Sequence, residues 1–299
     1  MYSMLIKKYA AIDIGSNAIR LLITSIIEQF NSQTKFKKTS LIRVPIRLGD
    51  DVFKLGLVSD DNYNRMEESI KAFKLLMKVH NVSKYRACAT SAMREAKNGQ
   101  SITEKIKNKT GIDIEIINGN EEAKIIALTD IKNYLVNDKT FLYVDVGGGS
   151  TELTLFSKGK SVLSKSFKIG TVRLINELVP DNVWNQMRSW IKAHTNNYQQ
   201  ITLLGTGGNI NSTYKFSGIK PGKPLSYIYL KEYFKTVKSF SYEERISKLN
   251  MNFDRADVIL PALKIYISAM KWSGAKEVYV PKIGLADGII RSLYRDNQM

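Results

Sequence analysis

The chain has 299 residues, a length suited to two domains of ordinary size, each with its own hydrophobic core. With 45 lysines and arginines against 28 aspartates and glutamates, its formal net charge is +17, which attracts anionic partners such as phosphates and polyanions. One cysteine and two histidines exclude an internal disulfide framework and a metal site built from several such residues. No apolar run approaches the ~18 residues of a membrane span and no secretory signal is evident, so we expect a cytoplasmic protein.

The first clear pattern along the chain is a β-hairpin that occurs twice. Residues 9–24 (YAAIDIGSNAIRLLIT) and 141–157 (FLYVDVGGGSTELTLFS) each contain an apolar run ending in Asp-aliphatic-Gly, a short polar turn and a second β-rich run. The matching acids, Asp13 and Asp145, are a domain's length apart. The repeat therefore predicts a duplicated fold, with one domain over residues 1–126 and the other over residues 127–299.

Between and after the hairpins, helical and strand patterns alternate, which indicates an α/β protein. We expect helices over residues 60–80, 121 to about 135, 181–198 and 231–240, and strands over residues 85–89 and 201–204. A last helix, over about residues 285–297, is expected to pack back on the first domain.

Three turns rich in glycine and small polar residues are candidates for binding phosphate. Backbone N–H groups and hydroxyls in such turns can surround an anion, although each turn alone could be an ordinary connection between elements. Three such turns in one chain, two of them after an Asp at the same offset, favour phosphate binding. The candidates are Gly15, Ser16 and Asn17 in the first turn, Gly147, Gly148, Gly149, Ser150 and Thr151 in the second, and Gly207 and Gly208 in the third.

Acidic residues beside these turns indicate a divalent cation. Asp13 and Asp145 end their strands just before a turn, where a carboxylate would repel phosphate unless a cation neutralised it. Glu152 lies on the return strand of the hairpin that contains Asp145. Mg²⁺ is bound by one or two carboxylates and keeps several waters, so these three acids are candidate metal ligands or water-positioning groups. The alternative is a turn-capping Asp and a solvated Glu.

For four further charged residues the pattern alone is less informative. Arg94 follows a buried strand and could either clamp a phosphate or lie solvated on the surface. Glu121 and Glu122 begin a helix, where the helix dipole favours acidic residues, so position alone indicates no catalytic role. Arg255 lies in a charged turn before an apolar helix.

Taken in chain order, several strings resemble the exopolyphosphatase/guanosine pentaphosphate phosphohydrolase (Ppx/GppA) family. They are AIDIGSNAIRLLI, ATSAMREAKN, INGNEEAKI, VDVGGGSTEL, LGTGGNI and DRADVILPA, and the resemblance covers nearly the whole chain. It implies the short, two-domain form of the family. The implied fold is a duplicated ribonuclease-H-like fold of the actin-like ATPase (ASKHA) type, with an interdomain cleft.

The resemblance also implies roles for individual residues. Glu122 matches the family's catalytic Glu, which activates the attacking water, and Asp145 and Glu152 match acids that hold Mg²⁺. Arg94 matches a phosphate-binding Arg, and Arg255 matches an Arg near the cleft. The implied activity is release of terminal phosphate from inorganic polyphosphate, with pppGpp as a second candidate substrate. The chain departs from the family at Ala286, where an Arg is common, so one cation of the family pattern is absent.

We expect Mg²⁺ as the cofactor, with K⁺ as a further candidate ion, and a homodimer. No basic stretch interleaved with aromatic residues indicates a nucleic-acid platform, so neither a specific nucleic acid nor a membrane is expected as a partner. Two alternative functions stay open. An ATP-dependent kinase or ATPase of the same superfamily would require an adenine pocket, and a non-catalytic polyanion-binding protein would bind without releasing phosphate.

Overall fold

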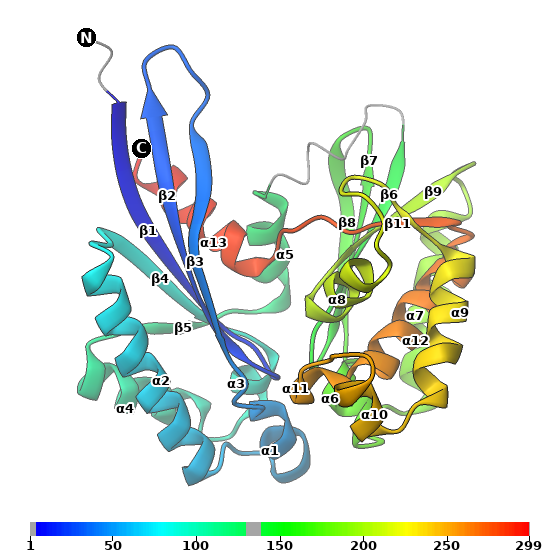
Figure 1. The fold of residues 1–299 in the computed structure, drawn as a ribbon, viewed down its shortest axis with the longest axis horizontal. Coiled ribbons are helices and arrows are strands. Elements are labelled where there is room, and N and C mark those ends of the chain that lie inside the picture. The colour runs from blue at the N-terminus through cyan, green and yellow to red at the C-terminus, as the bar shows by residue number, and fades with distance from the viewer. Residues whose placement is uncertain (1–3, 130–138, 299) are drawn as a thin grey trace. The chain divides into compact units, whose positions relative to one another are not determined.

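The computed structural model describes residues 4–129 and 139–298, and the chain divides into two compact units (Figure 1). Unit 1 comprises Met1–Thr129 together with Gly284–Met299, and unit 2 comprises Asp130–Ile283. The expected boundary after residue 126 is thus close to the observed one. Residues 284–299 belong to unit 1 although the expected second domain runs to residue 299, which agrees with the expectation that the last helix packs back on the first domain.

The described part of unit 1 contains a five-stranded sheet in the order β3-β2-β1-β4-β5. Its strands are β1 (Met4–Ile14), β2 (Ile19–Gln29), β3 (Lys35–Val44), β4 (Lys84–Ala89) and β5 (Ile114–Ile116). The first three strands are antiparallel, and β4 and β5 run parallel to β1. Its helices are α1 (Leu48–Leu55), α2 (Asp60–Val79), α3 (Ser91–Glu95), α4 (Gly99–Thr110), α5 (Gly119–Ala127) and α13 (Leu285–Asp296).

The described part of unit 2 contains a six-stranded sheet in the order β10-β11-β9-β6-β7-β8. Its strands are β6 (Thr140–Val146), β7 (Thr151–Ser157), β8 (Lys160–Phe167), β9 (Ile201–Thr206), β10 (Leu225–Ser226) and β11 (Glu277–Tyr279). Its helices are α6 (Thr171–Ile175), α7 (Asp181–Thr195), α8 (Gly208–Phe216), α9 (Tyr227–Ser239), α10 (Tyr242–Ser247), α11 (Phe253–Ala256) and α12 (Ile259–Ser273).

The two sheets repeat one topology, which confirms the expected duplication. The order β8-β7-β6-β9-β11 in unit 2 corresponds strand by strand to β3-β2-β1-β4-β5 in unit 1. In each sheet an antiparallel meander of three strands is followed by two strands parallel to the first. This is the ribonuclease-H-like arrangement, and it places the turn after β1 and the turn after β6 at equivalent positions.

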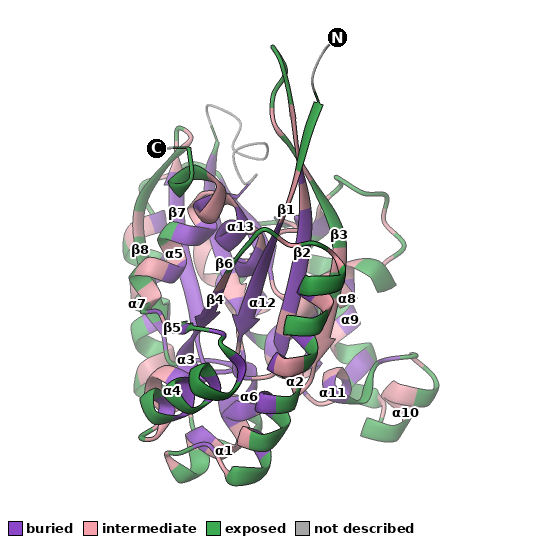
Figure 2. Cartoon of the chain, turned by 90° about the vertical axis from the view of Figure 1, so that its left-hand side faces the viewer, coloured by how far each residue is buried: buried purple, intermediate pink, exposed green. Residues whose placement is uncertain are grey.

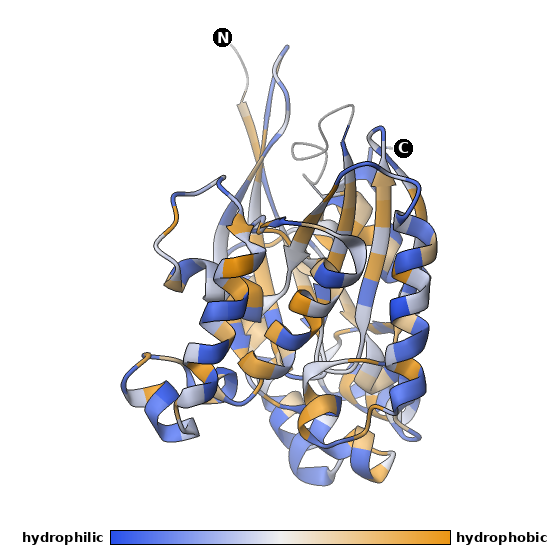
Figure 3. Ribbon diagram, turned by 90° about the vertical axis from the view of Figure 1, so that its right-hand side faces the viewer, coloured by the Kyte–Doolittle hydropathy of each residue, from blue (hydrophilic) through white to orange (hydrophobic). Residues whose placement is uncertain are grey.

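The central strands of both sheets are largely buried along their length, which accounts for their apolar sequences. In β1 the segment Tyr9–Ile14 is buried, whereas Met4, Leu5 and Ile6 at the other end of the strand are about half exposed (Figure 2). In unit 2 the central strands β6 and β9 are largely hydrophobic, whereas the helices mix hydrophobic and hydrophilic residues (Figure 3). Each unit has its own core cluster, so each buries enough apolar surface to form a separate folding domain.

Helix boundaries differ from the sequence expectations where a capping residue decides them. Helix α5 starts at Gly119 because the Asn118 side chain accepts a hydrogen bond from the Glu121 amide at 2.9 Å. The end expected for it near residue 135 lies outside the described residues. Helix α9 starts at Tyr227 rather than residue 231, because Ser226 caps it. Among the described residues, none of the helices combines the length and hydropathy needed to cross a bilayer.

Candidate phosphate-binding and catalytic site

The first glycine-rich turn connects β1 to β2. It is closed by the Gly15 amide, which donates to the Ala18 carbonyl at 3.1 Å. The Ser16 carbonyl accepts from the Gly49 amide of α1 at 2.8 Å. In a trans peptide the N–H points opposite to the C=O, so the amide of Asn17 faces away from α1. The turn therefore presents a backbone donor on its outer side.

The second turn uses the same device between β6 and β7. The Gly147 amide donates to the Ser150 carbonyl at 2.9 Å. The carbonyls of Gly147, Gly148 and Gly149 all accept hydrogen bonds from α6, at 3.0, 2.9 and 2.8 Å. The amides of Gly148, Gly149 and Ser150 belong to the same three peptide groups and so face away from α6. Three neighbouring amides directed to one side form an anion-binding nest.

Arg173 supports this second turn and was missed by sequence reasoning. Its side chain is buried in α6, and its Nε donates the 2.8 Å hydrogen bond to the Gly149 carbonyl. A buried guanidinium directly behind the nest adds positive charge to it. The only signal in the sequence is one basic residue within the otherwise mostly apolar string IGTVRLI.

Asp145 and Glu152 are direct cross-strand partners in the pairing of β6 with β7. Glu152 is buried, and its Oε1 accepts hydrogen bonds from Ser150 Oγ at 2.6 Å and Ser166 Oγ at 3.0 Å. Like charges placed directly opposite each other on a sheet are destabilising. The pair beside the nest therefore has the donor chemistry of a site for a hard divalent cation.

Asp13 occupies the position of Asp145 in the first repeat but has a different partner. Its cross-strand neighbour is Arg20, whose Nη1 lies 2.6 Å from Asp13 Oδ2. Arg20 stands at the place of Glu152 in the repeat. The charge of Asp13 is thus neutralised within the hairpin, so the structure gives it an ion pair where the sequence suggested a metal ligand.

Two hydroxyls expected to bind phosphate make internal contacts instead. Thr151 is fully buried, and its Oγ1 donates to the Ile169 carbonyl at 2.5 Å, so its side chain holds β7 in place. The Ser150 hydroxyl donates to Glu152. Ser150 therefore presents its backbone amide, rather than a hydroxyl proton, to an anion.

The third turn follows β9 and lies against the acids of unit 2. Gly207 has a φ of 108°, which favours glycine, and a Cβ there would lie 3.3 Å from Asp145 Oδ1. A Cβ on Gly208 would overlap the guanidinium of Arg255, whose Nη1 donates to Asn209 Oδ1 at 3.2 Å. The structure thus brings together Asp145, Glu152, the nest, the third turn and Arg255, all within unit 2.

A buried tyrosine lies beside Asp145 and was also missed by the motif analysis. The hydroxyl of Tyr143 is 2.6 Å from Thr206 Oγ1 and 3.4 Å from Asp145 Oδ2. Burial raises the pKa of Tyr143 well above its usual value. The phenol therefore stays neutral at ordinary pH and can donate a hydrogen bond toward the carboxylate.

In unit 1 the parallel strands β1 and β4 bring the first turn and α3 to one edge of the sheet. Ser16 Oγ and Ser91 Oγ lie 2.8 Å apart. Arg94, in the same helix as Ser91, donates from Nη1 to the Ile117 carbonyl at 2.7 Å. Ile117 directly precedes the cap of α5, whose first turn carries the buried Glu122. The residues predicted in unit 1 are therefore brought to the same edge, next to the start of α5.

The acids of unit 2 fit Mg²⁺ better than they fit a fully enclosed metal. Among residues 4–129 and 139–298, no group of three or more His, Cys, Asp or Glu side chains could hold an ion. Mg²⁺ needs no such cage, because it is usually bound by one or two carboxylates together with substrate phosphates and waters. Asp145 and Glu152 supply that number of carboxylates.

Known proteins with related sequences include enzymes that act on phosphate compounds. Exopolyphosphatase 1 of Mycobacterium tuberculosis is 20% identical over 304 residues, which cover 95% of this chain and 87% of that protein. The bifunctional 3-dehydroquinate synthase/phosphatase of Fusobacterium nucleatum is 30% identical over 219 residues, or 67% of this chain. The matched region spans only 32% of that longer protein.

Solved structures show the same fold. A Ppx/GppA family member from Aquifex aeolicus superposes with a TM-score of 0.77 at 25% identity, covering 99% of this chain and 100% of that one. An exopolyphosphatase from Cytophaga hutchinsonii has a TM-score of 0.83 at 23% identity, with 97% and 98% coverage, and this likeness concerns the fold. The model of the Ppx/GppA phosphatase family matches residues 26–296. Because this match runs from residue 26 to residue 296 and so covers most of the chain, the chain belongs to the Ppx/GppA phosphatase family.

Proposed function

We propose that this phosphatase is an exopolyphosphatase that releases the terminal phosphate of inorganic polyphosphate with the help of Mg²⁺. The observation that carries the proposal is the second turn, where a nest of three amides lies beside the Asp145–Glu152 pair. Amides bind the phosphate oxygens and carboxylates bind the accompanying cation, so one turn accommodates a metal-bound phosphate. The family match and the exopolyphosphatase relatives support this assignment.

Phosphoryl transfer needs an in-line nucleophile and neutralisation of the charge on the transferred group, and positioning and electrostatics supply most of the catalysis. In this proposal, Asp145 and Glu152 hold Mg²⁺, which supplies charge neutralisation at the phosphates. The nest of unit 2 and Arg255 bind phosphate oxygens. In this proposal the second turn therefore binds the terminal phosphate of polyphosphate before hydrolysis.

The attacking water is assigned to unit 1. Arg94 and the amide of Asn17 contribute positive potential at the edge where Glu122 begins α5. Glu122 accepts the proton of the water as the water attacks phosphorus, and the P–O bond to the rest of the chain breaks.

A phosphate-release assay tests the proposal directly. Long polyphosphate, short polyphosphate, pppGpp and ATP are compared in parallel, each with and without Mg²⁺. We expect release from polyphosphate that depends on Mg²⁺ and little turnover of ATP. Preferential hydrolysis of ATP would support an ATPase or kinase instead, and binding of polyphosphate without release would support a non-catalytic polyanion-binding protein.

The net charge of +17 favours a long substrate over pppGpp. A long polyanion that contacts basic residues beyond its terminal phosphate displaces counterions, so its affinity falls steeply with salt, as nucleic-acid binding does. The KM for long polyphosphate should therefore rise by roughly tenfold or more between 50 and 200 mM salt. A flat response would favour a short substrate such as pppGpp.

A further inference from the structure

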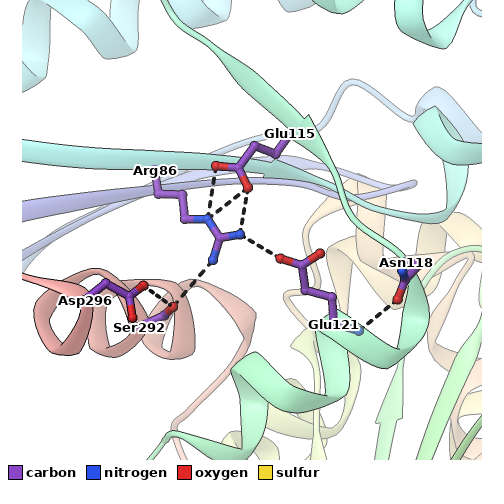
Figure 4. A network of polar contacts seen from close by, with 6 residues as sticks. All are labelled: Arg86, Glu115, Asn118, Glu121, Ser292 and Asp296. Carbon is purple, nitrogen blue, oxygen red and sulfur yellow. Dashed lines mark hydrogen bonds and ion pairs between the residues drawn. The ribbon is translucent and has the colours of Figure 1, made fainter. Parts of the chain in front are cut away.

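Arg86 of β4 links four elements of unit 1 through one guanidinium (Figure 4). Its Nε and Nη2 donate to Glu115 of β5 at distances of 2.7 to 3.2 Å. Nη2 also donates to Glu121 Oε1 in the first turn of α5 at 2.7 Å. Nη1 reaches Ser292 Oγ of α13 at 3.5 Å. The side chain of Arg86 is 17% exposed, whereas those of Glu115 and Glu121 are 51% and 41% exposed, so the guanidinium is mostly buried and its partners reach the solvent.

The contact with Glu121 changes the role expected for that residue. The sequence explains an acid at this position by the helix dipole alone, which is worth only a few tenths of a kcal/mol to about 1 kcal/mol. In the structure its carboxylate also accepts a hydrogen bond from the guanidinium of Arg86 at 2.7 Å. Hydrogen bonding to Glu115 raises the pKa of Arg86, so the guanidinium stays charged. Glu121 therefore connects α5 to β4 through Arg86, in addition to its favourable interaction with the helix dipole.

Helix α5 needs such attachments because it is short. It has nine residues, and isolated helices of fewer than about 12–15 residues are marginal in water. The Asn118 cap and the Arg86–Glu121 pair hold its first turn, and α13 packs against its second half, where a Cβ on Gly288 would overlap the Ile125 carbonyl. Glu122 is the next residue after Glu121. The direction of its carboxylate is therefore set by the same first turn.

We propose that Arg86 and Glu121 are positioning residues for hydrolysis: their ion pair fixes the first turn of α5 and thereby the carboxylate of Glu122. The inference rests on the proposed function of Glu122 and adds two residues that do not touch substrate. Misplacement of a reacting group by about 1 Å can cost ~100-fold in rate, so even a modest shift of α5 is measurable.

The test compares substitutions of two residues, Glu121 and Glu115, that both bind the guanidinium of Arg86. Glu121→Gln weakens the pair on α5, and Glu115→Gln is the matched control, because it weakens a more extensive contact with Arg86 that lies off the helix. We expect Glu121→Gln to lower kcat roughly tenfold while KM changes less than about twofold. Glu115→Gln should lower Tm and leave kcat within about twofold of the parent. Equal effects of both substitutions on kcat would overturn the proposal.

A second measurement separates positioning from a general loss of structure. If Arg86 and Glu121 act through Glu122, then Arg86→Met and Glu121→Gln should lower kcat no further when Glu122→Gln is already present. A full multiplicative loss in that background would show that they act elsewhere and would overturn the proposal.

Failure of the proposed function is distinguishable from failure of this inference. If the wild-type protein releases no phosphate from any substrate, hydrogen exchange of the amides of residues 119–127 still reports on the order of α5. Glu121→Gln should speed this exchange by roughly tenfold relative to Glu115→Gln. Identical exchange in both variants would overturn the positioning role whatever the substrate.

Discussion

Asp145 and Glu152 face each other directly across β6 and β7, at the register position where unit 1 pairs Asp13 with Arg20. The two copies of the hairpin have therefore diverged in charge. The copy in unit 1 carries its own counter-ion at 2.6 Å, whereas the copy in unit 2 places two acids at the same location. The pair of acids in unit 2 is therefore where we propose that Mg²⁺ binds.

Substitution of Asp145, but not of Asp13, should change the Mg²⁺ concentration needed for activity. Asp145→Asn removes one of the two carboxylates that we propose as Mg²⁺ ligands. The Mg²⁺ concentration for half-maximal phosphate release should rise by at least about tenfold, the lower end of the cost of losing even an indirect metal contact. Asp13→Asn should reduce Tm, because it leaves Arg20 without its ion pair, with the half-maximal Mg²⁺ concentration unchanged. Similar Mg²⁺ curves for both variants would contradict the assignment.

Glu122 should control the rate and not the binding of substrate. Replacing a general base typically costs ~10²–10⁴-fold, so Glu122→Gln should reduce kcat by that amount. Gln has the same size, so the affinity for polyphosphate, measured by calorimetry on the inactive variant, should stay close to that of the parent. Turnover near the wild-type rate would exclude Glu122 as the base.

The packing of α13 on α5 should not tolerate a methyl group at Gly288. A Cβ there would overlap the backbone carbonyl of Ile125, which cannot move without displacing α5. Gly288→Ala should therefore destabilise unit 1 by about 1–3 kcal/mol, seen as a lower midpoint of urea unfolding. Gly284→Ala is the control, because no atom lies within 4 Å of a Cβ at that position and the backbone there is extended.

Acid should remove the stabilisation supplied by Glu67. Hydrogen bonds from Lys109 and then Lys71, at 2.7 and 2.8 Å, lower the pKa of Glu67 from 4.5 to about 2. A folded-state pKa below the unfolded value gives stability that is complete above pH 4.5 and is lost as pH falls toward 2. The difference in Tm between wild type and Glu67→Gln should thus shrink from pH 6 to pH 2.5. Glu68→Gln, at an exposed partner of Lys71, should show little difference at any pH.

The only cysteine should report on unfolding of unit 1. Cys88 is fully buried in β4, and burial raises the pKa of its thiol to about 12, so almost no thiolate is present at pH 8. Its reaction with a disulfide reagent should follow the urea unfolding curve. Rapid labelling of the native protein would show that β4 opens independently of the rest of unit 1.

Local patterns were sufficient to predict the repeated elements. The Asp-aliphatic-Gly hairpins, the strands near residues 85–89 and 201–204 and the third glycine turn were all predicted from the sequence, because each depends on residues close together in the chain. The glycines of residues 147–149 also led us to predict an anion-binding turn, and phosphate binding by its amides stays a prediction. Their orientation, however, depends on hydrogen bonds from α6, which no local pattern contains.

The remaining features depend on which strands become neighbours. Arg86 meets Glu121 because β4, β5 and α5 lie beside one another, and the sequence alone offers Arg86 no particular partner. Arg173 was missed for the same reason. Thr151 was assigned to phosphate because hydroxyls are common in such turns, yet its position at the start of a buried strand directs its side chain to Ile169. Contacts of this kind depend on how the strands and helices pack together, and the type of residue alone does not reveal them.

The path of the chain has a consequence for its synthesis. Unit 2 is contiguous, whereas unit 1 receives α13 only from residues 284–299, with Ile289 and Ile290 completing its apolar interior. A ribosome therefore synthesises the segment that completes unit 1 only after it has synthesised the whole of unit 2. Until then unit 1 exposes the hydrophobic surface that α13 covers. Unit 2, by contrast, is contiguous and can fold as soon as residues 130–283 have been synthesised.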